Sequence, residues 1–260
     1  MMGQIAAVVQ PPAWEAILAG MRAGRPARLP EWPLRAPLDE FSTPENLLGW
    51  GLGYNVYHLP GTRLAVKVAM NRDARAMAES FIENQCESYH FWRSQMGECF
   101  MPPDVMFAYP HPEREGNRGC EIQMLVPGKP LWQITLGDLR GNPVLAARLH
   151  RMITGVLEVF ARCGRLPDVV GCHASAPTGF RLQRSARLTS NIRLDEYDWP
   201  WVVDVGAWPR GFSIDTASFT RRLMIYKWAW ELRLLRMQLA RILDHNAAAW
   251  DEAQMDCGQR

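Results

Sequence analysis

The sequence predicts an α+β fold in two lobes, a small strand-rich lobe followed by a larger and mostly helical one. Apolar β-type runs fill residues 47–70, and a helical spacing of apolar residues follows directly over 73–95. The longest helical patterns, near 144–163 and 217–245, both lie in the second half of the chain. We therefore place an N-terminal extension, a small lobe and a large lobe in chain order, at residues 1–44, 45–126 and 127–260.

The composition is that of an ordinary globular protein, with 48% apolar and 22% charged residues among 260. A net charge of +2 is too small to favour nucleic acid or a membrane as the partner. The six cysteines are scattered without a CxxC pair, which predicts reduced thiols. No leader pattern or membrane-length apolar run is present, so we expect a cytoplasmic protein; export by a leaderless secretion system would leave the same pattern.

The small lobe is preceded by a segment of mixed character. Residues 11–23 fit a short amphipathic helix, and the Pro-rich stretch 26–37 forbids regular structure after it. Within 47–70 we expect two antiparallel strands that turn at Pro60-Gly61, with Lys67 inside the second apolar run. This pattern predicts a β-hairpin with a lysine inside an apolar strand.

Strands and long helices follow in the rest of the chain. Residues 105–108 and 121–126 are typical of strands, and Pro127-Gly128 breaks the second. The segment 144–163 predicts a helix. The helix near 217–245 is rich in Trp, Leu and Arg, and we interpret it as a core-packing helix whose arginines extend to solvent, in preference to a nucleic-acid surface.

The first candidate site is a glycine-rich hairpin that precedes a strand lysine. Gly49, Gly51 and Gly53 come just before Val56, and Lys67 follows on the next apolar run. Glycines let backbone N–H groups approach a polyphosphate, and a lysine ammonium then neutralises the same phosphates. Three nearby glycines taken alone more often mark a bend or bulge in a strand pair. The order of the motifs that follow gives this one its weight.

The second candidate site lies on a predicted hairpin far downstream. Asn191 enters one apolar strand segment, and Asp204 leaves the next one thirteen residues later, after the polar turn Glu196-Tyr197-Asp198. A hairpin places both side chains at the same end, and amide and carboxylate oxygens suit Mg²⁺. A strand-end aspartate also commonly caps a turn, which is the alternative for Asp204.

With the glycine hairpin, the strand lysine, a glutamate-bearing helix, Asn191 and Asp204-Val205-Gly206 in this order, the chain resembles the protein-kinase-like superfamily, including its small bacterial and aminoglycoside-phosphotransferase-type members. The resemblance covers most of residues 45–210. It implies a two-lobed kinase-like fold with a reduced, mostly helical C-lobe and a cleft for ATP and Mg²⁺. Lys67 would then contact the α- and β-phosphates, while Asn191 and Asp204 would hold the metal.

The resemblance also implies neighbours for Lys67 and for the adenine ring. Glu87, twenty residues after Lys67, and Glu83, one helical turn earlier, are both candidates to pair with the lysine. The aromatic-rich sequence after Glu87 favours that residue, and the alternative is that both are solvated helix carboxylates. The strand break predicts that adenine contacts the backbone from Met124 to Val126.

The catalytic loop departs from the family pattern. The family has its catalytic aspartate five residues before the asparagine, and that position is Ala186. Asp168, after the predicted long helix, takes the role if residues 172–188 are an insertion, which costs little closure entropy. In the alternative, Asp168 caps a turn and the protein has no base. His173 is another candidate, although a lone histidine in such a loop more often faces solvent.

These features predict an ATP- and Mg²⁺-dependent phosphotransferase that moves the γ-phosphoryl group to an unidentified hydroxyl acceptor, with Asp168 and Lys67 in the catalytic roles. The absence of a long activation segment after Asp204 favours a small molecule, or a protein recognised through other surfaces. Two alternatives stay open. One is an inactive pseudokinase that binds a nucleotide or a protein, suggested by Ala186 and by Gly53, which stands one position earlier than the family's third glycine. The other is transfer of AMP to a protein.

Overall fold

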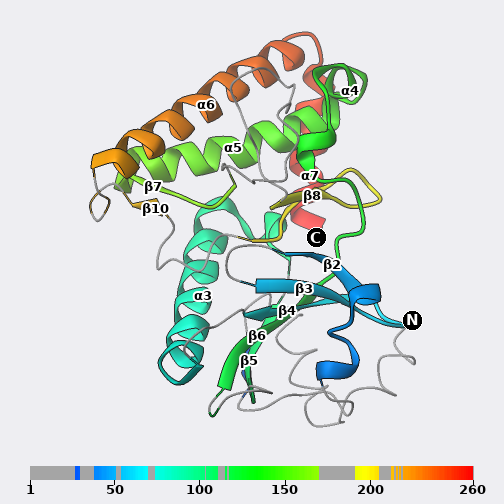
Figure 1. Cartoon of the computed structure of the whole chain (residues 1–260). Coiled ribbons are helices and arrows are strands. Elements are labelled where there is room, and N and C mark those ends of the chain that lie inside the picture. Colours follow the sequence, from blue (N-terminus) through cyan, green and yellow to red (C-terminus); the bar gives the residue numbers. More distant parts are fainter. Residues whose placement is uncertain are drawn as a thin grey trace. The chain divides into compact units, whose positions relative to one another are not determined.

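The computed structural model describes residues 27–29, 38–50, 54–69, 74–102, 104–110, 115, 117–169, 191–204, 212–213, 215, 217 and 219–259. The helix predicted at 11–23, the glycines Gly51 and Gly53, and the insertion predicted at 172–188 lie outside these residues. Within the described ranges, no helix is both long enough and apolar enough to cross a membrane. The α+β class is confirmed by a strand meander and several long helices (Figure 1).

The described residues form two compact units. Unit one lies within Met1–His90 and Pro102–Leu125, and unit two within Phe91–Met101 and Val126–Arg260. Helix α3 (Ala74–Met96) contributes residues to both units. Each unit has its own core, and each is described by itself below.

Unit one is built on a six-stranded sheet in the order β1-β5-β6-β4-β3-β2. The last five strands of that order are antiparallel neighbours, and β1 (Ala27–Leu29) pairs with β5 in parallel. Those five strands are β2 (Leu47–Trp50), β3 (Tyr54–Leu59), β4 (Leu64–Ala69), β5 (Asp104–Pro110) and β6 (Asn117–Met124).

The strand predictions need one correction. Residues 47–70 hold three strands, not the predicted two, because β2 ends at Trp50 and β3 begins at Tyr54. The predicted turn at Pro60-Gly61 does join β3 to β4. Gly61 has φ of +73°, a backbone conformation that is strained for residues with a side chain. The strands predicted at 105–108 and 121–126 correspond to β5 and β6.

One face of the sheet carries the apolar core of unit one. Alternate residues of the central strands, including Leu64, Val66 and Ile122, pack together with Leu38 and Phe41. The last two come from the segment that includes the 3₁₀ turns η1 (Leu38–Glu40) and η2 (Pro44–Asn46), which the sequence placed in an N-terminal extension up to residue 44. This segment therefore supplies part of the core.

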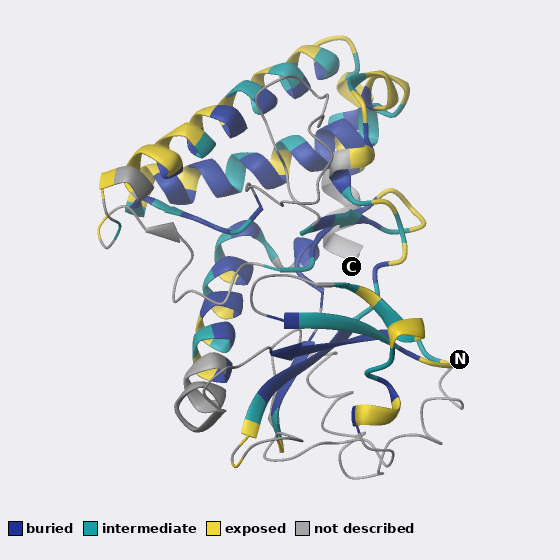
Figure 2. Ribbon diagram, in the orientation of Figure 1, coloured by how far each residue is buried: buried dark blue, intermediate teal, exposed yellow. Residues whose placement is uncertain are grey.

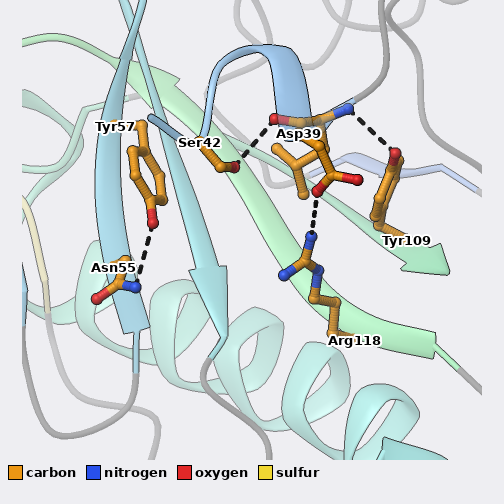
Figure 3. A network of polar contacts seen from close by, with 7 residues as sticks. Asp39, Ser42, Asn55, Tyr57, Tyr109 and Arg118 are labelled. Atoms are coloured by element: carbon orange, nitrogen blue, oxygen red, sulfur yellow. Dashed lines mark hydrogen bonds and ion pairs between the residues drawn. The ribbon is translucent and has the colours of Figure 1, made fainter. Parts of the chain in front are cut away.

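Polar contacts attach the same segment to the sheet (Figure 3). The Leu38 backbone N–H donates to the Tyr109 hydroxyl at 3.1 Å, and Arg118 lies 3.4 Å from the Asp39 carboxylate. Ser42 donates to the Leu38 carbonyl at 3.0 Å, which closes the η1 turn. Tyr109 and Arg118 belong to β5 and β6, so the contacts fix the segment against the edge half of the sheet.

The opposite face of the sheet packs against α3. Cys86 of α3 lies 3.3 Å from Met106 of β5, sulfur to sulfur, and Met106 is directly opposite Glu121 in the strand register. The helix confirms the prediction at 73–95 to within one residue at each end. Beside the apolar Met106, this face of the sheet carries buried polar strand residues, which are Lys67, Asp104, Glu121 and Gln123. The buried side of α3 adds Gln85 and Ser88.

Unit two is organised around α5 (Pro143–Cys163), which contacts α6 (Phe219–Leu243) and α7 (Ala247–Gln259) (Figure 1). The Asn142 side chain caps α5 by accepting from the Leu145 N–H at 3.0 Å, and Gly164 ends it with φ of +65°. Both helices predicted in this half, near 144–163 and 217–245, are confirmed.

Short elements complete unit two. The short helices are η3 (Glu98–Phe100), η4 (Leu131–Gln133) and α4 (Leu136–Gly141). The strand pairs are β7 (Arg165–Leu166) with β10 (Phe212–Ser213) and β8 (Ile192–Leu194) with β9 (Pro200–Val202).

The prediction of six reduced cysteines is wrong, as Cys99 shows. Cys86, Cys120 and Cys163 are free thiols, but Cys99 is disulfide-bonded. Disulfides persist mainly in oxidising compartments. The expectation of six reduced thiols therefore no longer supports a cytoplasmic location.

The strand break predicted at Pro127-Gly128 lies directly against β8. Arg193 donates to the carbonyls of Val126 at 3.0 Å and Gly128 at 2.8 Å, and the Leu194 N–H donates to the Lys129 carbonyl at 2.9 Å. A Cβ atom added at Gly128 would lie 1.8 Å from the Leu194 carbonyl oxygen. Only glycine permits this approach of the two backbones.

Gly128→Ala is therefore expected to lower the free energy of unfolding by about 3 kcal/mol, because backbone on both sides must move to admit the methyl group. Urea unfolding followed by circular dichroism measures the change. Gly141→Ala is the matched control, since nothing lies within 4 Å of its added Cβ. Equal stabilities of the two variants would contradict the close approach.

Candidate functional site

The predicted phosphate-binding residues of unit one lie in one row across the sheet. Gly49 pairs with Val56, Val56 with Lys67, and Lys67 with Glu121. Residues directly opposite each other in antiparallel strands have side chains on the same face. The structure therefore brings Gly49, Val56 and Lys67 together, and it adds Glu121 to them.

Lys67 forms a buried ion pair with Glu121. The Lys67 Nζ lies 2.6 Å from Glu121 Oε1, and the two side chains are only 7% and 4% exposed. The ammonium is also 5.8 Å from the centre of the Tyr54 ring, a cation–π distance. Charges in such a setting interact strongly because water does not screen them. The pair fixes the direction of the lysine.

Sequence reasoning missed Glu121. Glu121 is the single charged residue in the buried stretch 119–123 of β6, just as Lys67 is in the buried strand β4. Two opposite charges inside two buried strands are a signal for a buried ion pair, because either charge alone would have a large desolvation free energy. Glu87 and Glu83, the predicted partners, lie on α3 and are exposed residues. Pairing of Glu87 with Lys67 stays a prediction.

The segment predicted to contact adenine already makes internal backbone bonds. The Leu125 N–H donates to the Arg63 carbonyl at 2.9 Å, within unit one. The Val126 carbonyl accepts from Arg193 within unit two. An adenine contact along Met124 to Val126 would therefore use the other backbone groups of this segment, and it stays a prediction.

The three candidate catalytic and metal-binding residues of unit two come together. The Asn191 side-chain amide donates to the Asp168 backbone carbonyl at 2.6 Å, which joins the turn after β7 to the start of β8. The predicted hairpin is present as β8 and β9, and the Val203 N–H donates to the Asn191 carbonyl at 2.8 Å. Asp204 directly follows Val203, so the hairpin carries it to the same end as Asn191.

The electrostatics of Asp168 show that Asp204 is its neighbour. Burial of the Asp168 carboxyl, with the like charge of Asp204 beside it, raises the pKa of Asp168 from 3.8 to about 7, against a smaller lowering by a hydrogen bond from Asn191. A carboxyl group that titrates near neutral pH is suited to accept a proton. The structure brings the three residues together, and their catalytic and metal-binding roles stay a prediction.

The donor set fits a hard divalent cation. Because the Asn191 amide nitrogen bonds to Asp168, the amide oxygen is the Asn191 atom that a cation would use, beside the Asp204 carboxylate. Mg²⁺ prefers oxygen ligands, uses few protein groups and keeps several waters. Within the described ranges no cluster of three or more His, Cys, Asp or Glu side chains is suited to a metal, so a site built entirely from such protein ligands is not part of this arrangement. His173 and Ala186 lie outside the described residues.

Comparisons with known proteins identify no family. No family model matches the chain, and no curated protein matches it in sequence. Among solved structures, the chain is similar to an apo pseudokinase with a TM-score of 0.42 and 12% identity, over 90% of this chain and 95% of that one. The functional interpretation therefore depends on the residues of the two units themselves.

Glu121→Gln is expected to lower the free energy of unfolding by about 3 kcal/mol, because it leaves the buried Lys67 ammonium without its counter-charge. The double replacement Lys67→Met with Glu121→Met is expected to recover most of that loss, since no buried charge remains. Chemical unfolding of Lys67→Met, of Glu121→Met and of the double variant completes the cycle. Glu87→Gln, at an exposed position, serves as the control, and a loss as large as that of Glu121→Gln would contradict the assignment of the pair.

The stability of the metal-free protein is expected to fall as pH rises from about 4 to about 7. Asp168 holds its proton in the folded state over this window, whereas the unfolded chain releases it near pH 3.9, so ionisation above pH 7 costs up to about 4 kcal/mol. Asp168→Asn is expected to remove this part of the slope. Urea unfolding at pH 4.5, 6 and 7.5 in the presence of EDTA measures it. Identical pH dependence in the two proteins would show that Asp168 has an ordinary pKa.

Proposed function

We propose that this protein binds ATP with Mg²⁺ and transfers the γ-phosphoryl group to a hydroxyl acceptor. The observation that supports the proposal most directly is the meeting of Asp168, Asn191 and Asp204 at one end of the β8–β9 hairpin. Phosphoryl transfer needs little covalent chemistry from a protein, and it needs positioned charges and a proton acceptor. The two units supply both kinds of group.

Each residue has a role that follows from its chemistry. Lys67, whose direction is fixed by Glu121, is proposed to contact the α- and β-phosphates. Asn191 and Asp204 are proposed to hold Mg²⁺, which when bound neutralises charge on the β- and γ-phosphates. Asp168 is proposed to accept the proton of the acceptor hydroxyl. The row of Gly49 and Val56 beside Lys67 is proposed to cover the phosphates.

The reaction balances with these groups alone. The hydroxyl oxygen attacks the γ-phosphorus, and the bond from that phosphorus to the bridging oxygen of ADP breaks. The hydroxyl proton passes to the Asp168 carboxylate, and ADP leaves. The segment between Asp204 and helix α6 is short, which leaves little surface for docking a protein beside the site. An acceptor of small size, or a protein that binds elsewhere on the chain, fits this feature.

An inactive nucleotide-binding module is the second candidate. It is favoured by Ala186 at the position where the family has its aspartate, and by a lysine that is already paired inside the protein. Such a protein would bind ATP without turnover. The same measurement that tests the first proposal separates the two.

Asp204→Ala is expected to abolish Mg²⁺-dependent ATP binding, because the cation loses its carboxylate ligand, whereas Asp168→Asn is expected to keep binding and lose roughly 10²–10⁴-fold in turnover. Thermal-shift titration with ATP and Mg²⁺ measures binding, and ADP release with intact-protein mass spectrometry measures turnover. Asp251→Asn, an exposed carboxylate on α7, is the control.

Three outcomes discriminate the functions. ATP binding by the unaltered protein with no ADP release under any acceptor condition supports the inactive module. An added nucleotide monophosphate in the mass spectrum, in place of an added phosphate, supports AMP transfer. Full turnover in Asp168→Asn contradicts the role of Asp168 as the base.

A further inference from the structure

Helix α6 has two apolar faces. Among the described residues one face packs against α5, and the other is largely exposed, apart from an edge-on contact of the Tyr226 ring with Phe160 at 5.8 Å between ring centres. Ile225, Ala229, Leu232, Leu239 and Leu243 are buried on the side of the helix that contacts α5. These are the buried contacts of the core-packing helix that the sequence predicted. The second face is exposed to solvent along most of the helix (Figure 2).

The exposed apolar residues form one stripe, which we call the α6 stripe. Its members share large apolar side chains with more than half of their surface exposed, and they are Phe219, Leu223, Tyr226, Trp230 and Met237, at 76%, 55%, 53%, 58% and 52%. Their spacings of four, three, four and seven residues place them on one side of a helix. The buried residues of α6 lie on the opposite side.

Such a stripe is unusual on a protein surface. Single exposed apolar residues need no explanation, but a contiguous apolar patch typically marks an interaction site. Spacings of three and four that continue along the helix are the pattern that packs against a second helix. From Phe219 to Met237 the stripe extends over roughly 27 Å, which is about five helical turns.

The charges beside the stripe determine what kind of helix fits. Arg222, Lys227, Arg233 and Arg241 are exposed and lie near the stripe in the helical projection. The sequence of α6 contains one acidic residue, Glu231, which is buried and lies 3.8 Å from Lys227. A second copy of α6 would place these cations opposite one another, which is repulsive. An acidic helix would meet them with opposite charge.

We propose that the α6 stripe is the docking site for an acidic amphipathic helix of another protein. Apolar residues of the partner helix, spaced by three and four, pack on the stripe, with Trp230 near its centre. Glu and Asp residues that flank them pair with Arg222, Arg233 and Arg241. This site belongs to unit two and is independent of the proposed nucleotide chemistry.

The test uses the full-length chain and two synthetic helical peptides of five to six turns. Both carry Leu at positions spaced by three and four; one has Glu and the other Lys at the flanking positions. Fluorescence anisotropy is expected to show binding of the Glu peptide and none of the Lys peptide. Trp230→Ala is expected to weaken binding roughly tenfold or more, as removal of a central aromatic anchor does.

A charge reversal gives the sharpest comparison. Arg233→Glu combined with Arg241→Glu is expected to lose the Glu peptide and to gain the Lys peptide, because both residues are exposed and the fold does not depend on their charge. Arg151→Glu, an exposed arginine of α5, is the control and is expected to leave the binding of the Glu peptide unchanged. Circular dichroism confirms that each variant is folded.

Four results would overturn the proposal. They are equal binding of the two peptides; binding of neither; Trp230-dependent binding to vesicles of phosphatidylglycerol or to polyuridylic acid without binding of the Glu peptide; and Trp230-dependent self-association in sedimentation velocity without binding of that peptide. Equal binding would show that the flanking charges do not select the partner helix. Binding of neither peptide would show that the α6 stripe does not bind a helix. The last two assign the stripe to a membrane, to RNA or to a second copy of the chain.

Discussion

The hydrogen bond from the Asn191 side chain to the Asp168 carbonyl is the contact on which the candidate chemistry depends. It ties the turn after β7 to the first residue before β8, across 23 positions of sequence. Without it, the Asp168 carboxyl would have no reason to lie near Asp204, and its pKa would not be raised by that neighbour. The same amide cannot point its nitrogen at a cation, so the bond also selects the oxygen of Asn191 for any metal. One contact therefore joins the residues that we propose for proton transfer and for metal binding in unit two.

In unit one the corresponding constraint is electrostatic. Burial of the Lys67 ammonium on a central strand has a large desolvation free energy, and the Glu121 carboxylate on the neighbouring strand offsets it. Buried pairs of this kind contribute little net stability, so their retention is better explained by the specific direction they give to a charged group. Polar residues around the pair, such as Gln123 and Asp104, extend this environment along the α3 side of the sheet. Buried polar groups destabilise a core unless they have partners, whereas the same groups are suited to bind a charged ligand.

Local patterns were enough to predict the hairpin and the long helices, but not the contacts between distant segments. Asn191 and Asp204 were predicted together because their hairpin is local and its turn residues are recognisable. Glu121 was missed because its pairing with Lys67 depends on the register of two strands 54 residues apart, which no local pattern specifies. Leu38 and Phe41 were assigned to an extension because they follow a Pro-rich stretch that shows no regular pattern. Their apolar side chains become part of a core only when they pack against the assembled sheet. The exposed apolar stripe of α6 could not be foreseen, because a Trp- and Leu-rich helix predicts core packing and its sequence does not reveal which apolar side lacks a neighbour.

Each group of candidate residues is fixed within its own unit, and this has a consequence for how mutational effects combine. The Lys67–Glu121 pair depends on the register of β4 and β6, while Asp168, Asn191 and Asp204 depend on the β8–β9 hairpin. If substitutions in the two groups change folding stability additively, the groups are energetically independent in the absence of a ligand. Binding of one nucleotide by both groups would make their effects on affinity depart from additivity, because losing either group removes the benefit of the other. Additive effects on stability with non-additive effects on ATP affinity therefore distinguish a shared ligand from two independent structural features.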